Sequence, residues 1–457
     1  WGASTMLVGC IARRVRATAA AARRATAAAA NLRRPLASQA AAANAAPPAG
    51  EDVDEALRSA LAFDYAKGLP FVSDLDDAWF SGRAAFPRPL PMFRLLDPEV
   101  PGALAAGAEE RAATAAADEF LCRRMYETMV TLQALDDVFY HAQRQGRMSF
   151  YMQAAGEEAA TVCSAAGLEP DDEVFGQYRE QGCLLWRGFG LQAMADQCIG
   201  NVDSLDKGRV MPIHYGSKAL RFQTISSPLA TQIPHATGAA LAVKLAKEDR
   251  VVACYFGEGA ASEGDAHPAL NFAATLRVPA LFIVRNNGYA ISTPSDEQFA
   301  GDGIAPRALA LGMDAIRVDG NDALATVAAV RDARARVRAT GAPALVELMT
   351  YRLSHHSTSD DASKYRGADE LKALSVRARH PVDRLRAYMA ERGHWDDDDE
   401  ASARADTRAE VRAALDAAEA KDKPHVDTLF DDVYDELTPE LEKQKAALNA
   451  WMAAKGE

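Results

Sequence analysis

Val251-Val252-Ala253-Cys254-Tyr255-Phe256-Gly257-Glu258-Gly259 is the stretch that decides the fold. Its first six residues are apolar, and a second apolar run, Ala280-Leu281-Phe282-Ile283-Val284, ends in Arg285-Asn286-Asn287. Short apolar runs bounded by turn residues predict buried strands, and a helical pattern separates the two. Ligands of open parallel sheets bind at the carboxyl ends of the strands. The sequence therefore predicts that Glu258 and Asn287 lie at a binding edge.

The Gly-Glu-Gly turn has several interpretations. The plainest is an ordinary strand–turn–helix connection with a capping acid. A dinucleotide site is disfavoured because the third glycine is missing at Ser262, and Asn286-Asn287 stand where a ribose-binding acid belongs. A P-loop is disfavoured because no Gly-Lys-Ser/Thr follows. Gly-x-Gly followed by Asn-Asn at this separation resembles the thiamine diphosphate (ThDP) motif. In such a site a carboxylate and a carbonyl-type oxygen hold Mg²⁺ and leave positions for phosphate oxygens.

The pattern between residues 170 and 353 alternates strand and helix, which predicts an α/β fold with a doubly wound parallel sheet. An amphipathic pattern also predicts a helix over 118–145. The clearest expected strands are 250–257, 280–287, 315–319 and 343–353, and the clearest helices are 262–276 and 323–339.

Composition divides the chain further. Residues 1–50 contain seven arginines, no lysine and no acid, which predicts a mitochondrial transit peptide and linker. A disordered low-complexity tail is the alternative. Residues 51–115 are punctuated by proline and predict an extended N-terminal arm lying on another surface. Residues 116–380 form the predicted α/β domain, and the charged residues 381–457 predict a helical C-terminal extension.

Charge and cysteine content narrow the functional classes. The net charge of the 457-residue chain is −13 although its first fifty residues are basic, so nucleic acid is not an expected partner. No stretch is long and apolar enough to predict a membrane span. The six cysteines have no CxxC spacing, which argues against a zinc site or a redox dithiol and predicts reduced thiols of a matrix or cytosolic protein.

Four further stretches extend the ThDP resemblance to a family. They are Phe175-Gly176-Gln177-Tyr178-Arg179-Glu180, Ser226-Ser227-Pro228-Leu229-Ala230-Thr231-Gln232, Arg285-Asn286-Asn287-Gly288-Tyr289-Ala290-Ile291-Ser292, and Tyr351-Arg352-Leu353-Ser354-His355-His356-Ser357-Thr358-Ser359-Asp360-Asp361. From about residue 60 to about residue 445, the chain resembles the alpha subunits of branched-chain 2-oxo acid dehydrogenases. Glu258, where related pyruvate dehydrogenase alpha subunits usually carry Asp, favours the branched-chain group.

The resemblance implies a fold of the ThDP-binding type and a function. The function is oxidative decarboxylation of branched-chain 2-oxo acids, with acyl transfer to a lipoyl group, in valine, leucine and isoleucine degradation. It implies Mg²⁺ ligands at Glu258, Asn287 and the backbone carbonyl of Tyr289. The cofactor-binding residues that it implies are Tyr178, Arg179, Ser227, Leu229, Gly259, Ala260, Arg285 and His356. Guanidinium forks match phosphate oxygens, which suits the two arginines to this task.

Two further assignments rest on the resemblance. Ser226, Pro228, Thr231 and Gln232 resemble a K⁺ site, for which a hydrogen-bonded turn without metal is the alternative. His356 is implied to be catalytic, as a donor to phosphate or to the reacting group. A lone histidine is more often structural. Because adjacent side chains on an extended segment point in opposite directions, His355 is expected to face away.

Partners and regulation also follow from the resemblance. The glutamate that activates ThDP comes from a separate beta subunit in this family, which implies an alpha2beta2 heterotetramer and a lipoyl-bearing acyltransferase core in the mitochondrial matrix. Ser357 matches the main phosphorylation position of a regulatory kinase; a loop hydroxyl capping a turn is the alternative. A second such position is Gly367 here, which weakens the kinase prediction. A pyruvate dehydrogenase alpha subunit and a catalytically silent paralogue remain alternative functions.

Overall fold

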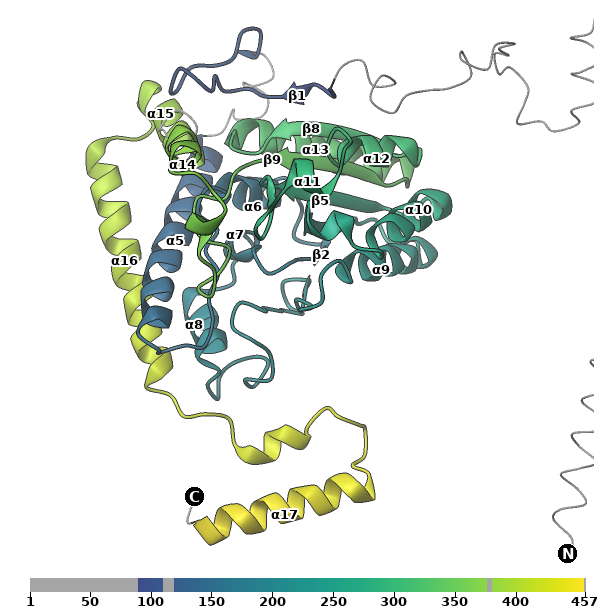
Figure 1. Ribbon diagram of the computed structural model, residues 1–457, viewed down its shortest axis with the longest axis vertical. Coiled ribbons are helices and arrows are strands. Elements are labelled where there is room, and N and C mark those ends of the chain that lie inside the picture. Colours follow the sequence, from purple (N-terminus) through teal and green to yellow (C-terminus); the bar gives the residue numbers. More distant parts are fainter. Residues whose placement is uncertain (1–88, 110–118, 376–379, 456–457) are drawn as a thin grey trace, which may run out of the picture. The chain divides into compact units, whose positions relative to one another are not determined.

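A computed structural model describes residues 89–109, 119–375 and 380–455, which all belong to one compact unit, Gly82–Glu457 (Figure 1). The predicted transit peptide, most of the predicted arm and the chain's first cysteine lie outside the described residues. The remaining five cysteines are buried and are not joined in disulfides. Within the described ranges no helix is long and apolar enough to cross a membrane.

The strands are β1 Met92–Phe93, β2 Glu173–Phe175, β3 Phe222–Gln223, β4 Val252–Gly257, β5 Ala280–Asn286, β6 Tyr289–Ala290, β7 Thr293–Pro294, β8 Asp314–Asp319 and β9 Ala344–Met349. The α-helices are α5 Glu119–Arg144, α6 Glu158–Ala165, α7 Gln181–Trp186, α8 Leu191–Ile199, α9 Gln232–Ala246, α10 Ala266–Leu276, α11 Ser295–Gln298, α12 Ala305–Ala310, α13 Ala323–Thr340, α14 Ala368–Leu374, α15 Pro381–Glu391, α16 Asp397–Glu419 and α17 Pro439–Lys455. Short 3₁₀ helices are η2 Ala260–Ser262, η3 Ala362–Lys364 and η4 Val426–Phe430.

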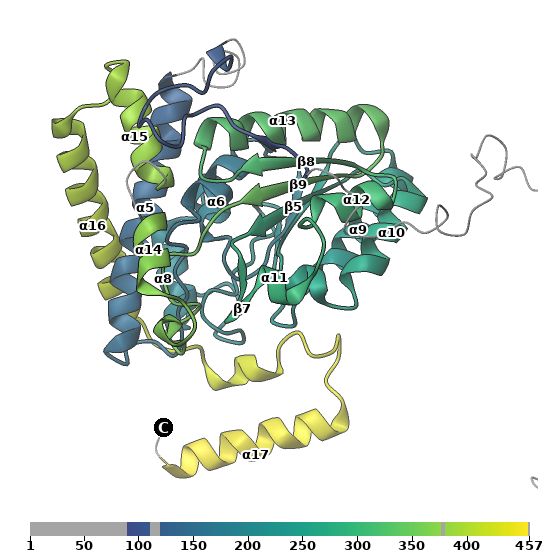
Figure 2. The ribbon, with the colours of Figure 1, turned by 45° about the horizontal axis from the view of Figure 1, so that its top comes forward.

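The main sheet confirms the predicted fold class. Its seven strands follow the order β1-β8-β9-β5-β4-β2-β3, and every neighbouring pair is parallel. Helices cover both faces of the sheet, as Figure 2 shows. A small antiparallel hairpin, β6–β7, follows β5 directly. The described part of the N-terminal arm supplies the edge strand β1, which pairs with β8.

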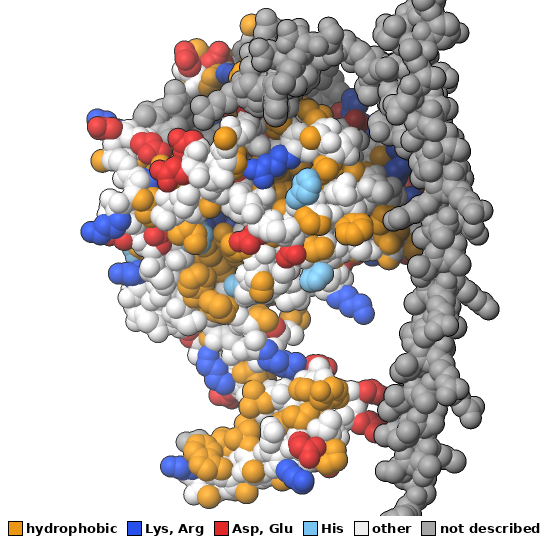
Figure 3. Space-filling view, turned by 45° about the vertical axis from the view of Figure 1, so that its right-hand side comes forward, with side chains coloured by type: hydrophobic (Ala, Val, Ile, Leu, Met, Phe, Trp, Pro, Cys, Tyr) orange, Lys and Arg blue, Asp and Glu red, His pale blue; other side chains and the backbone are white. Residues whose placement is uncertain are grey.

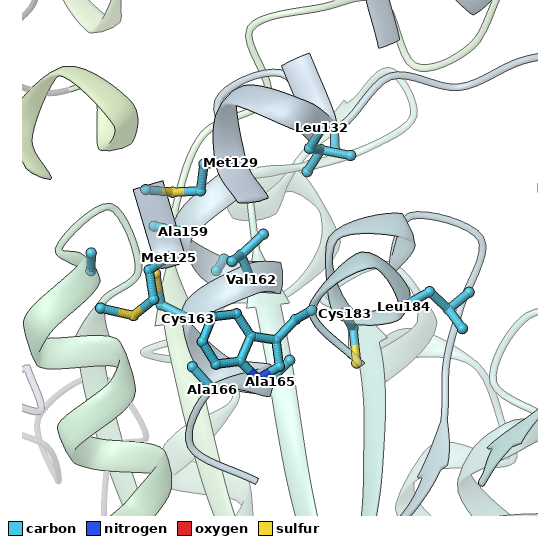
Figure 4. Packing of buried hydrophobic residues seen from close by; sticks show 14 of the residues in the cluster. Met125, Met129, Leu132, Ala159, Val162, Cys163, Ala165, Ala166, Cys183 and Leu184 are labelled. Atoms are coloured by element: carbon cyan, nitrogen blue, oxygen red, sulfur yellow. The ribbon is translucent and has the colours of Figure 1, made fainter. Parts of the chain in front are cut away.

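Alternating side chains of the central strands feed two cores. On β4, Ala253 and Tyr255 belong to one apolar cluster, and Cys254 and Phe256 belong to the other. The first cluster continues into α5, α6, α13 and α16, while α9, α10 and α12 cover the second. Figure 4 shows side chains of α5, α6 and α7 packed together in the first cluster. Because both faces are buried, the strands read as continuous apolar runs in the sequence.

Most predicted elements are confirmed, but two boundaries were wrong. The strand expected to reach residue 353 ends at Met349. The N–H of Thr350 still donates to the carbonyl oxygen of Asn286 on β5, but the N–H of Leu353 donates to the carbonyl oxygen of Ala155, outside this ladder. The helix expected from residue 262 begins at Ala266, because η2 and an extended Glu263 come first. After residue 380, α15 and α16 are helical as predicted, and both pack against α5.

Candidate active site

A cavity of about 220 Å³ opens at the carboxyl ends of β2, β4, β5 and β9. Of the residues predicted for ThDP and Mg²⁺, all except Ser227 line it. This agrees with the general rule that ligands of parallel sheets bind at this edge. The lining residues are Gln177, Tyr178, Arg179, Leu229, Gly257, Glu258, Gly259, Ala260, Glu263, Arg285, Asn287, Tyr289, Ala290, Ile291, Arg352 and His356.

Glu258 has a carboxylate oxygen without a protein partner. It follows β4 directly, and its Oε2 accepts a hydrogen bond from the backbone N–H of Asn287 at 3.2 Å. Its Oε1 is buried and has no hydrogen-bond partner. Burial, with a contribution from the nearby charge of Glu157, raises the pKa of Glu258 to about 7. A buried oxygen without a partner is costly, so the site fits a cation at this position.

Asn287 presents its two amide ends to different neighbours. Its Nδ2 donates to Oε1 of Glu157 at 3.0 Å, and its Oδ1 accepts from the backbone N–H of Tyr289 at 3.1 Å. Within the described ranges, no group of three or more His, Cys, Asp or Glu side chains has the placement of a metal site. A site built from one carboxylate, one amide oxygen and a carbonyl instead suits a hard ion that keeps positions for phosphate oxygens or water.

Arg285 is held by two buried carboxylates. Its Nε donates to Oε1 of Glu180 at 2.6 Å, and its Nη1 donates to Oε2 of Glu157. Burial alone would raise the pKa of Glu157, but the charges of Arg285 and Arg179 outweigh it, and the pKa lies below its ordinary value. The guanidinium is therefore fixed in one orientation at the cavity wall.

Arg179 and His356 lie against one another. Nη2 of Arg179 donates to the carbonyl oxygen of His356 at 3.0 Å, and the hydroxyl of Tyr178 lies 3.3 Å from the His356 Nε2. Burial, together with the positive charges of Arg179 and Arg352, lowers the pKa of His356 to about 3. The imidazole is therefore neutral at physiological pH. His355 faces elsewhere, as expected: its Nδ1 accepts from the N–H of Ala362 at 2.9 Å.

Gly259 lines the cavity, and packing against Ala290 also requires a glycine at this position. A Cβ at this residue would lie 2.8 Å from the Cβ of Ala290, so the close approach of the β6–β7 hairpin requires glycine.

The predicted potassium loop is a hydrogen-bonded turn in this structure. The hydroxyl of Thr231 donates to Oγ of Ser226 and to the carbonyl oxygen of Pro228, both at 2.9 Å. The Gln232 amide donates to the carbonyl oxygen of Tyr255 at 3.1 Å. Two hydroxyls and a carbonyl thus converge at one point of the loop, and K⁺ there stays a prediction. Ser227 is exposed beside this turn, away from the cavity lining.

Ser357 is nearly buried, with 9% of its surface exposed. Its hydroxyl oxygen accepts from the N–H of Ser359 at 3.2 Å. The segment around it is held by Asp360, whose Oδ2 accepts from the N–H of His356 at 2.8 Å and from the hydroxyl of Tyr365 at 2.5 Å. The loop that carries the phosphorylation candidate thus also carries the cavity histidine.

Sequence reasoning missed three charged residues of the site. Arg352 is fully buried in the cavity wall, and its Nε and Nη1 have no hydrogen-bond partner. Glu157 and Glu180 are the buried counterions of Arg285. Arg352 and Glu180 lie inside the motifs quoted above. For Glu157 the available signal was an acidic pair, with Glu158, at the start of an otherwise uncharged helix.

Residues 126–427 match the family described as "Dehydrogenase E1 component". The chain is 52% identical over 334 residues to the mitochondrial 2-oxoisovalerate dehydrogenase subunit alpha of Homo sapiens, which covers 73% of this chain and 75% of that protein. The chain is 51% identical over 337 residues to the mitochondrial 2-oxoisovalerate dehydrogenase subunit alpha of Caenorhabditis elegans, which covers 74% of this chain and 78% of that protein. It is also 51% identical over 330 residues to the mitochondrial 2-oxoisovalerate dehydrogenase subunit alpha 1 of Arabidopsis thaliana, which covers 72% of this chain and 70% of that protein.

Proposed function

Since this chain belongs to the dehydrogenase E1 component family, among the 2-oxoisovalerate dehydrogenase alpha subunits, we propose a specific function for its cavity. It catalyses ThDP- and Mg²⁺-dependent oxidative decarboxylation of branched-chain 2-oxo acids and transfers the acyl group to a lipoyl arm. The step belongs to the degradation of valine, leucine and isoleucine.

One observation carries this proposal. The unpartnered Oε1 of Glu258 and the amide of Asn287 lie in the same cavity wall as Arg179, Arg285 and His356. A hard-cation site beside fixed guanidinium groups is the chemistry that a magnesium diphosphate requires.

The residues have distinct tasks in the proposed site. Glu258, Asn287 and the carbonyl of Tyr289 hold Mg²⁺, while Arg179 and Arg285 orient the diphosphate. ThDP, when bound, supplies the carbon that attacks the keto group and the electron sink for loss of CO₂. Because His356 is neutral, its Nε2 donates a hydrogen bond to an anionic oxygen in one tautomer and accepts one from the Tyr178 hydroxyl in the other. Arg352 adds positive charge to the same wall.

The proposed assembly follows the family. The chain works with a beta subunit as an alpha2beta2 heterotetramer, and it serves a lipoyl-bearing acyltransferase core. Its exposed apolar side chains support docking to another chain: Leu245 on α9 is 73% exposed, and Phe272 on α10 is 61% exposed. Figure 3 shows hydrophobic side chains exposed among charged ones on the face that it draws. The curated relatives are named as mitochondrial proteins, and we place this chain in the mitochondrion, in the matrix.

Co-expression with the beta subunit tests the proposed function. The purified complex should decarboxylate 3-methyl-2-oxobutanoate only when ThDP and Mg²⁺ are both present. The chain purified alone should bind ThDP poorly and turn over no substrate, because the activating glutamate belongs to the partner. Rapid decarboxylation by the isolated chain would contradict the two-chain site.

A further inference from the structure

Glu157 lies beneath the cavity and reaches three of its residues. The side chain is fully buried. Its Oε1 accepts from Nδ2 of Asn287 at 3.0 Å and lies 3.5 Å from Nε of Arg179, and its Oε2 accepts from Nη1 of Arg285. One carboxylate therefore contacts a proposed metal ligand and both proposed diphosphate ligands.

The backbone that carries Glu157 is held in place. Gly156 has a φ of +91°, and a Cβ there would lie 2.1 Å from the carbonyl oxygen of Tyr351. The hydroxyl of Thr350 donates to the carbonyl oxygen of Gly156 at 3.0 Å. The residues that follow β9 therefore clamp the turn before α6, and the Glu157 carboxylate is directed to one place.

This placement decides how the amide of Asn287 is oriented. An amide has a donor end and an acceptor end, and Mg²⁺ takes only the oxygen. Because a carboxylate accepts hydrogen bonds and cannot donate them when ionised, Glu157 selects the orientation in which Nδ2 faces it. The Oδ1 of Asn287 then faces away from Glu157. A neutral side chain at position 157 would leave the N–H of Tyr289, which donates to Oδ1 at 3.1 Å, to favour this orientation without the carboxylate.

The neighbouring glutamate shows that burial alone does not produce these contacts. Glu158 is equally buried, with 1% exposed, but it accepts from Gln133 at 3.0 Å and from the N–H of Gly156 at 2.9 Å. Neither of these partners is a proposed ligand of the cofactor or the metal. Glu157 and Glu158 are therefore adjacent, equally buried glutamates with different partners, and Glu158 serves as the control for Glu157.

We infer that Glu157 is a positioning residue that fixes the metal-binding orientation of Asn287 and aligns Arg179 and Arg285 for the diphosphate. The inference rests on the proposed ThDP–Mg²⁺ site. Partners that orient metal ligands in this way typically change metal affinity by 10–100-fold when they are removed.

The first experiment measures Mn²⁺ binding, as a substitute for Mg²⁺, by electron paramagnetic resonance of the complex with the beta subunit at saturating ThDP. Glu157→Gln should weaken Mn²⁺ binding by on the order of 10–100-fold, and Glu158→Gln should leave it unchanged. Glu180→Gln removes the other counterion of Arg285 without touching Asn287, so it should affect ThDP affinity more than Mn²⁺ affinity. Unchanged Mn²⁺ binding in Glu157→Gln overturns the inference.

The second experiment reverses the amide chemistry. Asn287→Asp adds a negatively charged metal ligand, which by itself strengthens Mn²⁺ binding. It also places the new carboxylate at position 287 against the carboxylate of Glu157, and the two repel each other. It should therefore weaken binding in the otherwise normal chain. The double variant Glu157→Gln/Asn287→Asp should recover much of the affinity, because a glutamine amide donates to the new carboxylate. Tighter binding by Asn287→Asp alone, or purely additive losses in the double variant, contradicts the role of Glu157.

The normal complex separates this inference from the function on which it rests. If the unaltered complex binds no Mn²⁺ in the presence of ThDP, the proposed metal site itself is wrong. If it binds Mn²⁺ and Glu157→Gln binds equally well, only the positioning role fails.

Discussion

The Tyr178 hydroxyl lies 3.3 Å from Nε2 of His356, a contact between residues 178 positions apart in the chain. Tyr178 follows β2, and His356 lies in the loop beyond β9. Arg179, beside Tyr178, holds the His356 carbonyl through Nη2. The two outermost motifs of the sequence therefore meet at one wall of the cavity, and a disturbance of the loop after β9 acts directly on residues that follow β2.

Replacement of His356 should change the pH dependence of stability. Burial lowers its folded-state pKa to about 3, whereas an unfolded histidine has a pKa of about 6.5. Below about pH 6.5 the unfolded chain therefore binds a proton at this histidine and the folded chain does not. The free energy of unfolding therefore decreases as the pH is lowered. Between pH 7.5 and pH 5, the Tm of the unaltered complex should decrease more than the Tm of the complex that carries His356→Gln. Replacing the exposed His141 serves as the control, and equal slopes for the complex and His356→Gln would refute the neutral imidazole.

Loss of the Glu258 carboxylate should weaken cofactor binding through the metal. Glu258→Ala removes the side chain with the unpartnered oxygen, and the ThDP concentration needed for half-saturation should rise on the order of 10–100-fold. Asn287→Ala should behave likewise. Fluorescence titration with ThDP at fixed Mg²⁺ measures both variants. If both saturate like the unaltered complex, the metal assignment is wrong.

A negative charge at Ser357 should inactivate the complex. The serine is 9% exposed and adjoins His356, so a phosphoryl group adds charge and bulk where the loop has little room. Ser357→Glu, an imperfect mimic, should lower overall complex activity severely at saturating ThDP, and limited proteolysis should cut first between Ser354 and Arg366. Ser357→Ala should keep substantial activity. Near-normal activity and unchanged protection in Ser357→Glu would make this serine an ordinary loop hydroxyl.

Gly156→Ala should destabilise the turn that carries Glu157. The positive φ costs an alanine roughly 1–2 kcal/mol, and the added Cβ also collides with the Tyr351 carbonyl. Gly146→Ala isolates the first effect, since Gly146 has a φ of +78° and no heavy atom within 4 Å of the added Cβ. Chemical or thermal unfolding should therefore rank Gly156→Ala as clearly more damaging than Gly146→Ala. Equal losses would show that the close approach to Tyr351 relaxes at no cost.

The sheet was readable from the sequence because its central strands are buried on both faces. Uninterrupted apolar runs such as Val251–Phe256 leave few alternatives to a parallel strand. Short strands gave no such signal: β1 and β3 have only two residues each, and their pairing depends on neighbours distant in the chain. The end of β9 was misplaced for the same reason, since a contact with Ala155 turns the chain there.

The site was readable only in part. Motifs named the residues that face the cavity, such as Glu258 and Arg285, but not the buried acids behind them. Glu157 and Glu180 have no distinctive spacing, and their importance comes from tertiary contacts: both pair with Arg285, and Glu157 also contacts Arg179 and Asn287. Arg352 was visible inside a motif, yet nothing local shows that two of its nitrogens lack partners.

The most direct test of the account compares two substrates on the purified complex with the beta subunit, at saturating ThDP and Mg²⁺. The kcat/KM for decarboxylation of 3-methyl-2-oxobutanoate should exceed that for pyruvate by roughly tenfold or more, the discrimination that an apolar pocket achieves for extra carbon atoms. Pyruvate turned over as efficiently as the branched acid, or more so, would contradict the assignment to branched-chain 2-oxo acids.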